Sequence, residues 1–466
     1  MKEVATKGHF HIVYVLKYIR YGLLLCLVPM IQAAIRFDLP SLYTALRQDA
    51  VILIVMFFVS LAIWQKLGFS FTDKTLTLRY GVILKQTIQV HTDQIAVVEL
   101  DRSLFLRLVG CTRVKLYAAR SASFGSVKFY LRKHHAAMLA ERMMPVKNES
   151  SFFAPTGAER IRFTMLSANI VTTAALLVFS AKQTQDILGQ NLGAELGHLA
   201  VSNLEKIEQL AELFLPAGVA WLFTLGFILW GISLFWSLLT TANFRVSRSG
   251  GIILSKGGYI NHTERRVLAS AVSYCDIRIT PTSRLLRCYP VYLSAGNYSG
   301  ADLPILVYSK GRDALLQALM PKFTPPSQVA GLTVNRSMPQ FIWKSGSLLL
   351  LCAALTAVSV WRLPELTPLL VIPLLLSCGL VVAGIEGWFT EGVRRNKNGT
   401  LSIRYTRFFT HHQLCVFTPD LSFSVFQTPF SENVARCNLS IRLPCRRRVR
   451  IRSIKRYEAD RLKLVI

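Results

Sequence analysis

The chain has 466 residues, 52% of them hydrophobic, and a formal net charge of +28. Its mean hydropathy is +0.38, and the apolar residues form blocks instead of being spread evenly. These values exclude a single domain and an ordinary soluble composition, and they indicate about two to four units with membrane-spanning segments.

The basic excess lies in three separate stretches. Residues 66–147, 241–345 and 386–466 carry net charges of +9, +9 and +10 by count of Lys, Arg, Asp and Glu, which is the whole excess. Basic segments beside membrane spans stay on the cytoplasmic side and attract anionic lipid. We therefore expect all three on one cytoplasmic face, with anionic phospholipid headgroups as partners in preference to nucleic acid.

Nine cysteines are scattered along the chain without a C-x-x-C pair. That spacing predicts neither a disulfide framework nor a zinc site, and it is typical of a reducing compartment. The cysteines are Cys26, Cys111, Cys275, Cys288, Cys352, Cys378, Cys415, Cys437 and Cys445.

The first predicted membrane hairpin covers residues 12–66. A basic N-terminus precedes an apolar run at 21–35, and a second apolar run follows at 51–64. Each run is shorter than the ~20 residues that a spanning helix requires, so both helices must extend into flanking residues. A basic start before an apolar run also fits a cleaved signal peptide, which is the less favoured alternative.

Two further hairpins are predicted at residues 163–240 and 341–386, and their apolar runs lack Asp, Glu, Lys, Arg and His. The loop 183–212 is acidic and is expected outside the cell, either as an amphipathic surface helix or as an irregular loop. Six spans place both termini in the cytoplasm. The uncharged spans argue against a proton relay or an ion-coupled transporter.

Each hairpin leads into a block of short β-type runs that ends in one helix. A polar turn separates two alternating runs at the start of every block, as a β-hairpin requires. The blocks are residues 67–148, 241–325 and 387–466, and they share one order of about seven strands and a terminal helix. A repeat of this length indicates a domain copied three times.

One stretch of the first block carries a family resemblance. Residues 94–110 read Gln-Ile-Ala-Val-Val-Glu-Leu-Asp-Arg-Ser-Leu-Phe-Leu-Arg-Leu-Val-Gly. This stretch is similar to the K-I-Q-x-V…Q-S-x-x-x-R-x-x-G signature of YdbT-like bacterial membrane proteins, which carry bacterial pleckstrin-homology (PH) domains. The second block keeps Ser283-Arg-Leu-Leu-Arg287 without the glycine, and the third departs further, with Phe430-Ser-Glu-Asn-Val-Ala-Arg436.

With this resemblance, we expect an α+β membrane protein. Six transmembrane helices form three hairpins, each followed by a PH-like β-barrel or sandwich capped by a C-terminal helix. The resemblance also implies envelope stress or antimicrobial-peptide resistance as the role, with a smaller related PH-domain membrane protein as partner. Arg107, Arg287 and Arg436 are interpreted as one recurring position of the signature, with the structural role of tying a loop to backbone carbonyls.

The chain lacks the common catalytic and cofactor-binding motifs. Walker A, G-x-G-x-x-G, G-x-S-x-G and H-E-x-x-H stretches do not occur in it. The acids Glu99 and Asp101 are interpreted as solvated or ion-paired. His411 and His412 are adjacent, so on a strand they point to opposite faces, which disfavours a shared metal. We expect no enzyme activity, no cofactor and no metal.

The strongest charge feature is a predicted strand near the C-terminus. Alternation puts Arg448, Arg450 and Arg452 on one face, with Val449 and Ile451 on the other. A cationic face beside a membrane attracts anionic headgroups by ~1 kcal/mol per charge, and guanidinium groups suit phosphate. The same charge would also set topology without any ligand. The candidate headgroup-binding residues are Arg446, Arg447, Arg448, Arg450 and Arg452.

The sequence therefore predicts a non-enzymatic, multi-pass protein of the inner membrane. Its three basic PH-like domains bind anionic lipid, a partner membrane protein or both, and a homo-oligomer is compatible with this prediction. The alternative is a protein–protein scaffold whose basic charge only sets the topology. A transporter is less favoured, because the spans supply no charged site.

Overall fold

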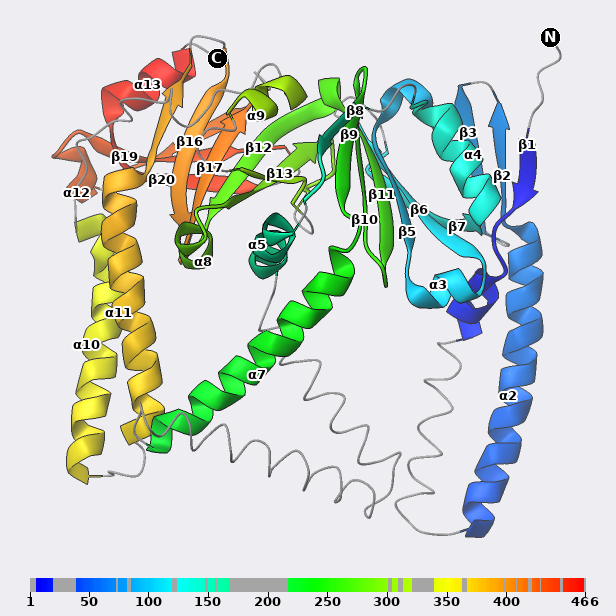
Figure 1. Ribbon diagram of the computed structural model, residues 1–466, viewed down its shortest axis with the longest axis horizontal. Helices are drawn as coiled ribbons and strands as arrows, with labels where there is room; N and C mark the ends of the chain where they lie inside the picture. Colours follow the sequence, from blue (N-terminus) through cyan, green and yellow to red (C-terminus); the bar gives the residue numbers. More distant parts are fainter. Residues whose placement is uncertain are drawn as a thin grey trace. The chain divides into compact units, whose positions relative to one another are not determined.

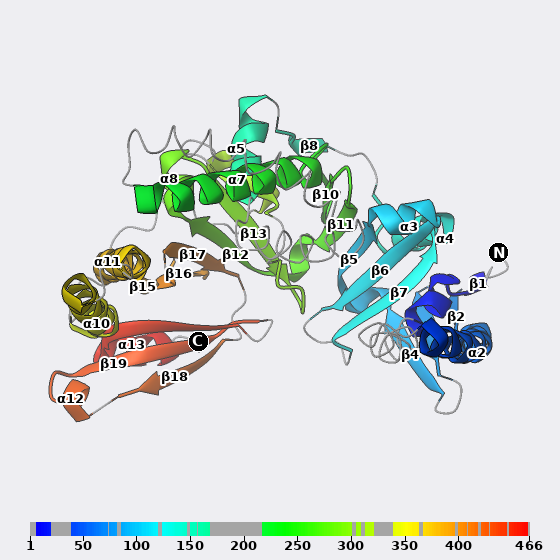
Figure 2. The ribbon, with the colours of Figure 1, turned by 90° about the horizontal axis from the view of Figure 1, so that it is seen from below.

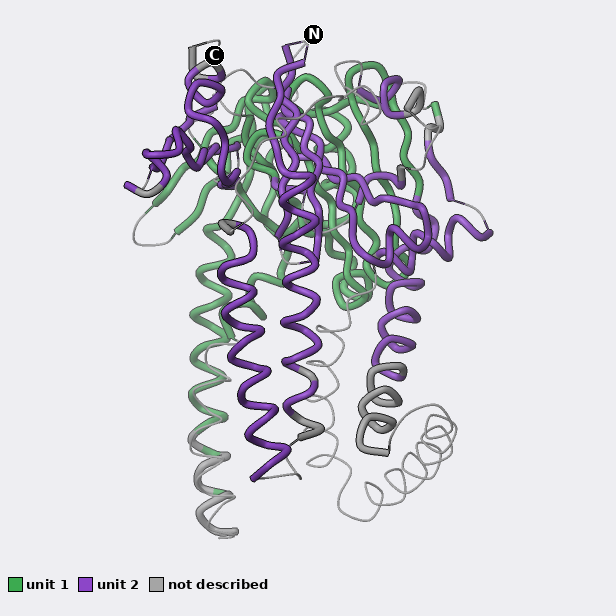
Figure 3. Tube along the Cα trace, turned by 90° about the vertical axis from the view of Figure 1, so that its left-hand side faces the viewer, with its two compact units in different colours: residues 1–151, 245–272, 295–298 green, residues 152–244, 273–294, 299–466 purple. Residues whose placement is uncertain are grey.

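We describe the protein from a computed structural model, which divides into two compact units (Figure 3). Unit 1 comprises residues 1–151, 245–272 and 295–298, and unit 2 comprises residues 152–244, 273–294 and 299–466. The second block of the sequence is thus divided between the units. The structure describes residues 6–19, 39–72, 74–81, 85–119, 124–146, 150–155, 157–167, 217–300, 304–308, 313–320, 339–362, 367–396, 399–407, 409–417, 421–427, 429–444 and 447–464.

Three of the described helices are long and apolar enough to cross a membrane, as expected of a membrane protein (Figure 1). They are α2 (Leu39–Lys66), α10 (Pro339–Arg362) and α11 (Thr367–Thr390). A fourth helix, α7 (Ala217–Thr240), has a shorter apolar stretch at Ile228–Thr240. The apolar run at 21–35 and residues 168–216 of the hairpin predicted at 163–240, including the acidic loop 183–212, lie outside the described residues, so the six-span arrangement stays a prediction.

Helices α10 and α11 pack along each other, and small residues permit the close approach. A Cβ atom at Gly384 would lie 2.9 Å from the carbonyl oxygen of Phe341, which is too close for any other residue without a shift. Glycine at helix contacts of this kind is common in membrane bundles.

The first block packs two sheets and one helix around a single core. Leu76, Val98 and Phe129, which come from both sheets, join Leu139 of α4 in one buried cluster. In β2 and β3 every second residue is buried, the period-2 pattern of a half-covered sheet. The elements of the block are β2 (Gly68–Thr72), β3 (Thr75–Tyr80), β4 (Gln86–His91), the 3-10 turn η1 (Thr92–Gln94), β5 (Ile95–Arg102), α3 (Leu104–Leu108), β6 (Cys111–Ala118), β7 (Ser126–Arg132) and α4 (Lys133–Met143). Strand β1 (Thr6–His9) precedes the block and pairs with β2.

The second block repeats this order of three strands, a fourth strand, a short helix and further strands. Its elements are β9 (Arg245–Ser249), β10 (Ile252–Gly257), β11 (His262–Leu268), the 3-10 turn η2 (Ala269–Ala271), β12 (Val272–Ile279), α8 (Pro281–Leu285), β13 (Tyr289–Ala295), β14 (Leu306–Tyr308) and α9 (Asp313–Leu319). Strand β8 (Ser150–Phe153) and helix α5 (Ala158–Ser167) precede it.

The third block has the same order and its own core. That core takes Ile403 and Leu414 from the first strands, Leu439 and Ile451 from the later strands, and Ala459 from the last helix. Its elements are β15 (Gly392–Arg395), β16 (Leu401–Arg407), β17 (Thr410–Val416), β18 (Ser422–Phe426), α12 (Pro429–Glu432), β19 (Arg436–Arg442), β20 (Arg448–Lys455) and α13 (Arg456–Leu464).

Strand pairing joins consecutive blocks at two places. In the first joint, β5 of the first block runs antiparallel to β11 of the second, with Val97 opposite Val267. In the second joint, β12 of the second block runs antiparallel to β17 of the third, with Tyr274 opposite Val416. The joints produce a seven-stranded sheet, β7-β6-β5-β11-β10-β9-β8, and a six-stranded sheet, β14-β13-β12-β17-β16-β15.

The barrel form of the fold prediction is wrong for the described residues. The other two sheets, β1-β2-β3-β4 and β18-β19-β20, are open as well, so every described sheet has two end strands. In the first two blocks the fourth strand pairs with the block that follows it, so it is not available to close a barrel within its own block. The cores of the first and third blocks lie between two open sheets.

Candidate functional site

Strand β20 has the two faces that its sequence predicts. Val449 and Ile451 are buried in the third core, whereas Arg448 and Arg450 are exposed. The alternation follows from the pleat of a strand, which directs successive side chains to opposite faces. The strand therefore presents cations on one face while its other face packs into the block.

Three arginines form a cationic face on β19 and β20. Arg442 lies directly opposite Arg448, and the guanidinium carbon of Arg450 lies 5.7 Å from the ring centre of Phe426. All three side chains are exposed, and among the described residues no carboxylate lies within ion-pair distance of them. Like charges directly opposite on a sheet repel each other. An anion bound here would relieve that repulsion.

The structure does not place all five predicted arginines on this face. Arg452 donates two hydrogen bonds to the buried carboxylate of Glu391, at 2.5 and 3.3 Å, and lies over the ring of Phe341. A bidentate pair of this kind is strong and directional, so Arg452 serves the fold. Arg446 lies outside the described residues, and the remaining candidate, Arg447, points inward.

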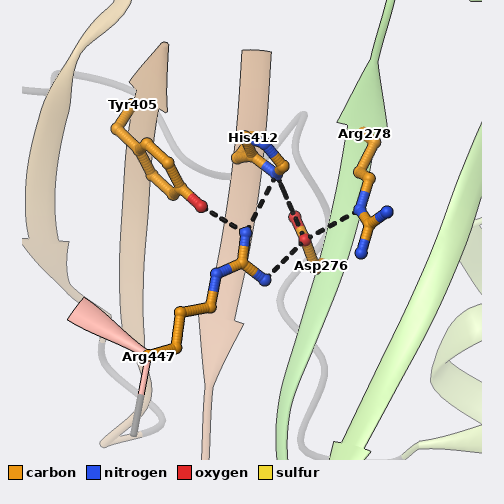
Figure 4. Close-up of polar contacts among 5 residues, drawn as sticks. All are labelled: Asp276, Arg278, Tyr405, His412 and Arg447. Atoms are coloured by element: carbon orange, nitrogen blue, oxygen red, sulfur yellow. Dashed lines mark hydrogen bonds and ion pairs between the residues drawn. The ribbon is translucent and has the colours of Figure 1, made fainter. Parts of the chain in front are cut away.

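Arg447 joins a buried charge cluster at the second joint (Figure 4). Its Nη1 atom donates to Oδ2 of Asp276 at 3.0 Å, and its Nη2 atom donates to the hydroxyl of Tyr405. The Nδ1 atom of His412 lies 3.1 Å from both carboxylate oxygens of Asp276, and Arg278 donates to Oδ2 at 3.2 Å. The side chain of Asp276 is thus bonded from three sides.

Electrostatics favours the ionised form of Asp276 in spite of its burial. Burial alone would raise the pKa of this carboxyl, but the hydrogen bond from His412 and the charges of His412, Arg447 and Arg278 lower it below its usual value. For Arg447, burial is the largest single influence and opposes the charge, but Asp276, Tyr405 and Tyr274 together outweigh it, so the pKa of Arg447 is raised. Burial raises the pKa of the Tyr405 phenol to about 12. The charges of Asp276, Arg447, Arg278 and His412 thus compensate one another at the second joint.

A second buried carboxylate occupies the first joint. Glu99 of β5 accepts from Nζ of Lys115 at 3.1 Å and lies 3.6 Å from Nη2 of Arg265, across the joint. Asp101, on the same strand, is paired with Arg113. The interpretation of Glu99 and Asp101 as ion-paired agrees with these contacts, although both are buried rather than solvated.

The two adjacent histidines point to opposite faces of β17. His411 lies 2.6 Å from the carboxylate of Glu386 through Nε2, whereas His412 lies against Asp276. Within the part of the chain that the structure describes, no group of three or more His, Cys, Asp and Glu side chains could hold a metal ion. The described residues offer no constellation for metal chemistry.

The three arginines of the family-like stretch occupy three different places. Arg107 lies inside α3 and donates to the carbonyl of Tyr259 at 2.7 Å. Arg287 follows α8 with a φ of 52°, beside a cavity of about 370 Å³, and Arg436 begins β19. What the three blocks share is a residue with positive φ between the short helix and the next strand. These residues are Gly110, Arg287 and Ala435. Arg107 thus shows the expected bond from an arginine to a backbone carbonyl in another loop, whereas Arg436 donates to the hydroxyl of Ser453 at 3.1 Å.

Sequence reasoning missed Asp276 and Arg442, and it named Arg447 for headgroup binding without recognising its inward position. Asp276 is the only carboxylate in the apolar run Val272–Ile279, a pattern that indicates a buried, paired acid. Arg447 has the same parity as Val449 and Ile451, so alternation places it on the inward face. Arg442 belongs to the cationic face only through its pairing with Arg448, which no local pattern indicates.

Comparison with known proteins supports part of the family resemblance. Residues 24–146 match the family model of the bacterial PH domain. No curated protein and no solved structure matches the chain. The match covers the second predicted span, the first block with α4, and the signature-like stretch at residues 94–110. Residues 24–146 therefore contain a bacterial PH domain.

Proposed function

We propose that the chain is a membrane-anchored binding protein that holds anionic lipid headgroups on the third of its PH-like blocks, at the cytoplasmic face of the inner membrane. The observation that carries this proposal is the cationic face, where Arg442 and Arg448 lie opposite each other with Arg450 beside them. A headgroup phosphate accepts several guanidinium hydrogen bonds and removes the repulsion between the arginines. The bacterial PH domain and the three apolar helices support binding at a membrane.

The finer architecture belongs to the same proposal. Six spans with both termini in the cytoplasm would bring the three basic blocks to one membrane face, as the distribution of Lys and Arg favours. The order of elements in the second and third blocks, which follows that of the first, supports three PH-like domains of the YdbT-like type. A role in envelope stress with a smaller PH-domain partner rests on that resemblance alone.

Lipid titration of the full chain tests the headgroup site. The chain is purified in a neutral detergent, and binding of fluorescent phosphatidylglycerol is measured by anisotropy, with phosphatidylcholine carrying the same fluorophore as the neutral probe. Replacing Arg442, Arg448 and Arg450 by Gln together should weaken phosphatidylglycerol binding at least tenfold, because each charge near anionic lipid contributes ~1 kcal/mol. Phosphatidylcholine binding should not change.

A matched variant controls for the loss of net charge. Lys128, Arg132 and Lys133 are exposed on unit 1, and their replacement by Gln removes the same three charges elsewhere. This variant should bind phosphatidylglycerol like the parent chain. Equal affinity of the parent for both lipids, or an equal loss in both triple variants, would contradict a specific cationic face.

A second function, a protein scaffold, is favoured by a different observation. Two of the five predicted headgroup-binding arginines form ion pairs with buried carboxylates instead. Arg447 is paired with Asp276 and Arg452 with Glu391. In this alternative the basic charge sets topology, and the blocks bind other protein surfaces. Salt separates the two functions, because ~1 M salt screens headgroup attraction and leaves assembly through buried apolar surface intact.

A further inference from the structure

The two joints use equivalent strands in the same register. In each, the third residue of the block's fourth strand, Val97 or Tyr274, lies opposite a buried valine near the end of the next block's third strand, Val267 or Val416. Each joint comprises six antiparallel residue pairs in all. A repeated register of this kind indicates that these two strands are complementary edges in every copy of the block.

Among the strands that the structure describes, one copy of each edge has no partner strand: the third strand of the first block and the fourth strand of the third block. Strand β4 is the third strand of the first block and ends the sheet β1-β2-β3-β4, and β18 is the fourth strand of the third block and ends the sheet β18-β19-β20 (Figure 2). Their counterparts in the joints bury more residues: three of seven in β11, five of seven in β17, seven of eight in β5 and six of eight in β12. By contrast, β4 has one buried residue and β18 has none.

The two leftover edges also lack the residues that normally prevent strand pairing. Native sheet edges are protected by Lys or Arg, by Pro or by short length. The end strands β1, β7, β15 and β20 each contain Lys or Arg, and β8 and β14 have only four and three residues. β4 (Gln-Thr-Ile-Gln-Val-His) and β18 (Ser-Phe-Ser-Val-Phe) contain no Lys, Arg, Asp, Glu or Pro, in a chain with 54 Lys and Arg.

We propose that β18 of one copy of this chain pairs antiparallel with β4 of a second copy, forming a head-to-tail third joint. The occupant is a second copy because the chain itself carries both members of an edge pair that it already uses twice. Such a contact joins two unlike surfaces and is therefore heterologous. It continues a sheet by main-chain hydrogen bonds, as in strand addition.

The existing joints set the register of this third joint. Phe423 and Val425 of β18 pair with Ile441 and Leu439 of β19, as Val98 and Leu100 of β5 pair with Leu116 and Val114 of β6. Ser422 thus corresponds to Val97 and lies opposite Val90, the buried valine of β4. Counting along both strands places Phe426 opposite Gln86.

Disulfide trapping between differently tagged copies tests this register. One full-length copy carries Gln86→Cys and the other Phe426→Cys, both at exposed positions, and the two are co-expressed and oxidised in membranes. Directly opposite residues bring their Cβ atoms to ~5 Å, close enough for a disulfide after small adjustment. The matched control replaces Gln86→Cys by Gln89→Cys, an exposed position about 10 Å further along the same strand.

We expect the Gln86→Cys and Phe426→Cys pair to give cross-tag dimers at least tenfold more than the control pair or the parent chain with its native cysteines. Equal yields from both pairs would overturn the proposal. So would a preference for dimers between two Phe426→Cys copies or between two Gln86→Cys copies, because those require an isologous contact.

A non-covalent measurement checks the same contact. The parent chain in detergent should have the mass of two or more copies by light scattering, and Ser424→Lys should shift it toward the monomer, since a charge blocks an edge. Ser440→Lys, opposite Ser424 on the neighbouring inner strand, should leave the mass unchanged. A monomeric parent chain, or an equal effect of both lysines, would overturn the proposal.

Discussion

Each of the two joints has a buried carboxylate at the same position of its strand. The cationic partners of the two carboxylates come from different parts of the chain. Glu99 and Asp276 each lie two residues beyond the residue that faces the buried valine of the partner strand. Glu99 is bonded by Lys115 of its own block and faces Arg265 across the joint. Asp276 is bonded by His412 across the joint and by Arg447 near the start of β20.

The difference concerns how replaceable the partners are. If Glu99 is removed, Lys115 still lies 4.0 Å from Asp101 and retains a carboxylate. If Asp276 is removed, Arg447 has no other carboxylate among its described contacts and remains beside the rings of Tyr274 and Tyr405. The corresponding residue of the unpaired edge strand is Ser424. A buried acid thus accompanies each formed joint, and the second joint depends more heavily on its acid.

The largest effect is expected from Asp276→Ala. Removing one partner of a buried ion pair leaves an uncompensated charge and costs about 3–5 kcal/mol. Hydrogen exchange of the β12 and β17 amides in the full chain should accelerate accordingly, whereas β5 and β11 should keep their protection. The double variant Asp276→Leu with Arg447→Met removes both charges and should recover part of the loss. Equal acceleration in both joints would contradict separate stabilisation.

A smaller effect is expected from Glu99→Ala at the first joint. We expect a loss of about 1–3 kcal/mol, the cost of an unsatisfied buried group, because Lys115 keeps a second acid within reach. Hydrogen exchange of β5 and β11 reports it. Replacing Asp101 together with Glu99 removes that acid as well, so the double variant should lose more than the sum of the single losses. If the losses of stability were strictly additive, Lys115 would not switch its ion pair from Glu99 to Asp101.

Acid should weaken the second joint through Asp276. The pKa of this carboxyl is held below its usual value in the folded chain, chiefly by His412 and Arg447 against the effect of burial. A lowered pKa contributes stability above the unfolded value, and that stability is lost as pH falls through the folded pKa. Exchange at β12 and β17 should therefore accelerate below about pH 4. Asp276→Asn should remove this pH dependence; an unchanged profile would assign it to other groups.

Local pattern was sufficient for elements and faces. Apolar runs predicted the hydrophobic helices α2, α7, α10 and α11, and period-2 alternation predicted the buried Val449 and Ile451 beside the exposed Arg448. Both signals depend on residues within one or two turns or pleats of each other. These two signals therefore do not depend on how distant parts of the chain pack.

The joints could not be predicted in the same way. Alternation tells which side of a strand is buried but not which strand lies beside it, and β5 and β11 are separated by most of a block and a hairpin. The roles of Asp276 and Arg447 depend on such a neighbour, since their ion pair spans the second and third blocks. The missed inward position of Arg447 is different, because its parity with Val449 was visible in the sequence.

The smallest effect is expected at the residue next to Arg447. Arg448→Gln removes an exposed cation that faces Arg442, so stability should change by no more than about 0.5 kcal/mol, and any change should be favourable because a like-charge contact is relieved. Arg447→Gln, one position earlier, leaves the buried Asp276 undercompensated and should accelerate exchange at β12 and β17. Hydrogen exchange and phosphatidylglycerol anisotropy, measured on both variants, should give opposite rankings: Arg448→Gln weakens lipid binding without loosening the joint, and Arg447→Gln loosens the joint. If both variants lost lipid affinity and amide protection to the same extent, the distinction between the buried Arg447 and the exposed Arg448 would be wrong.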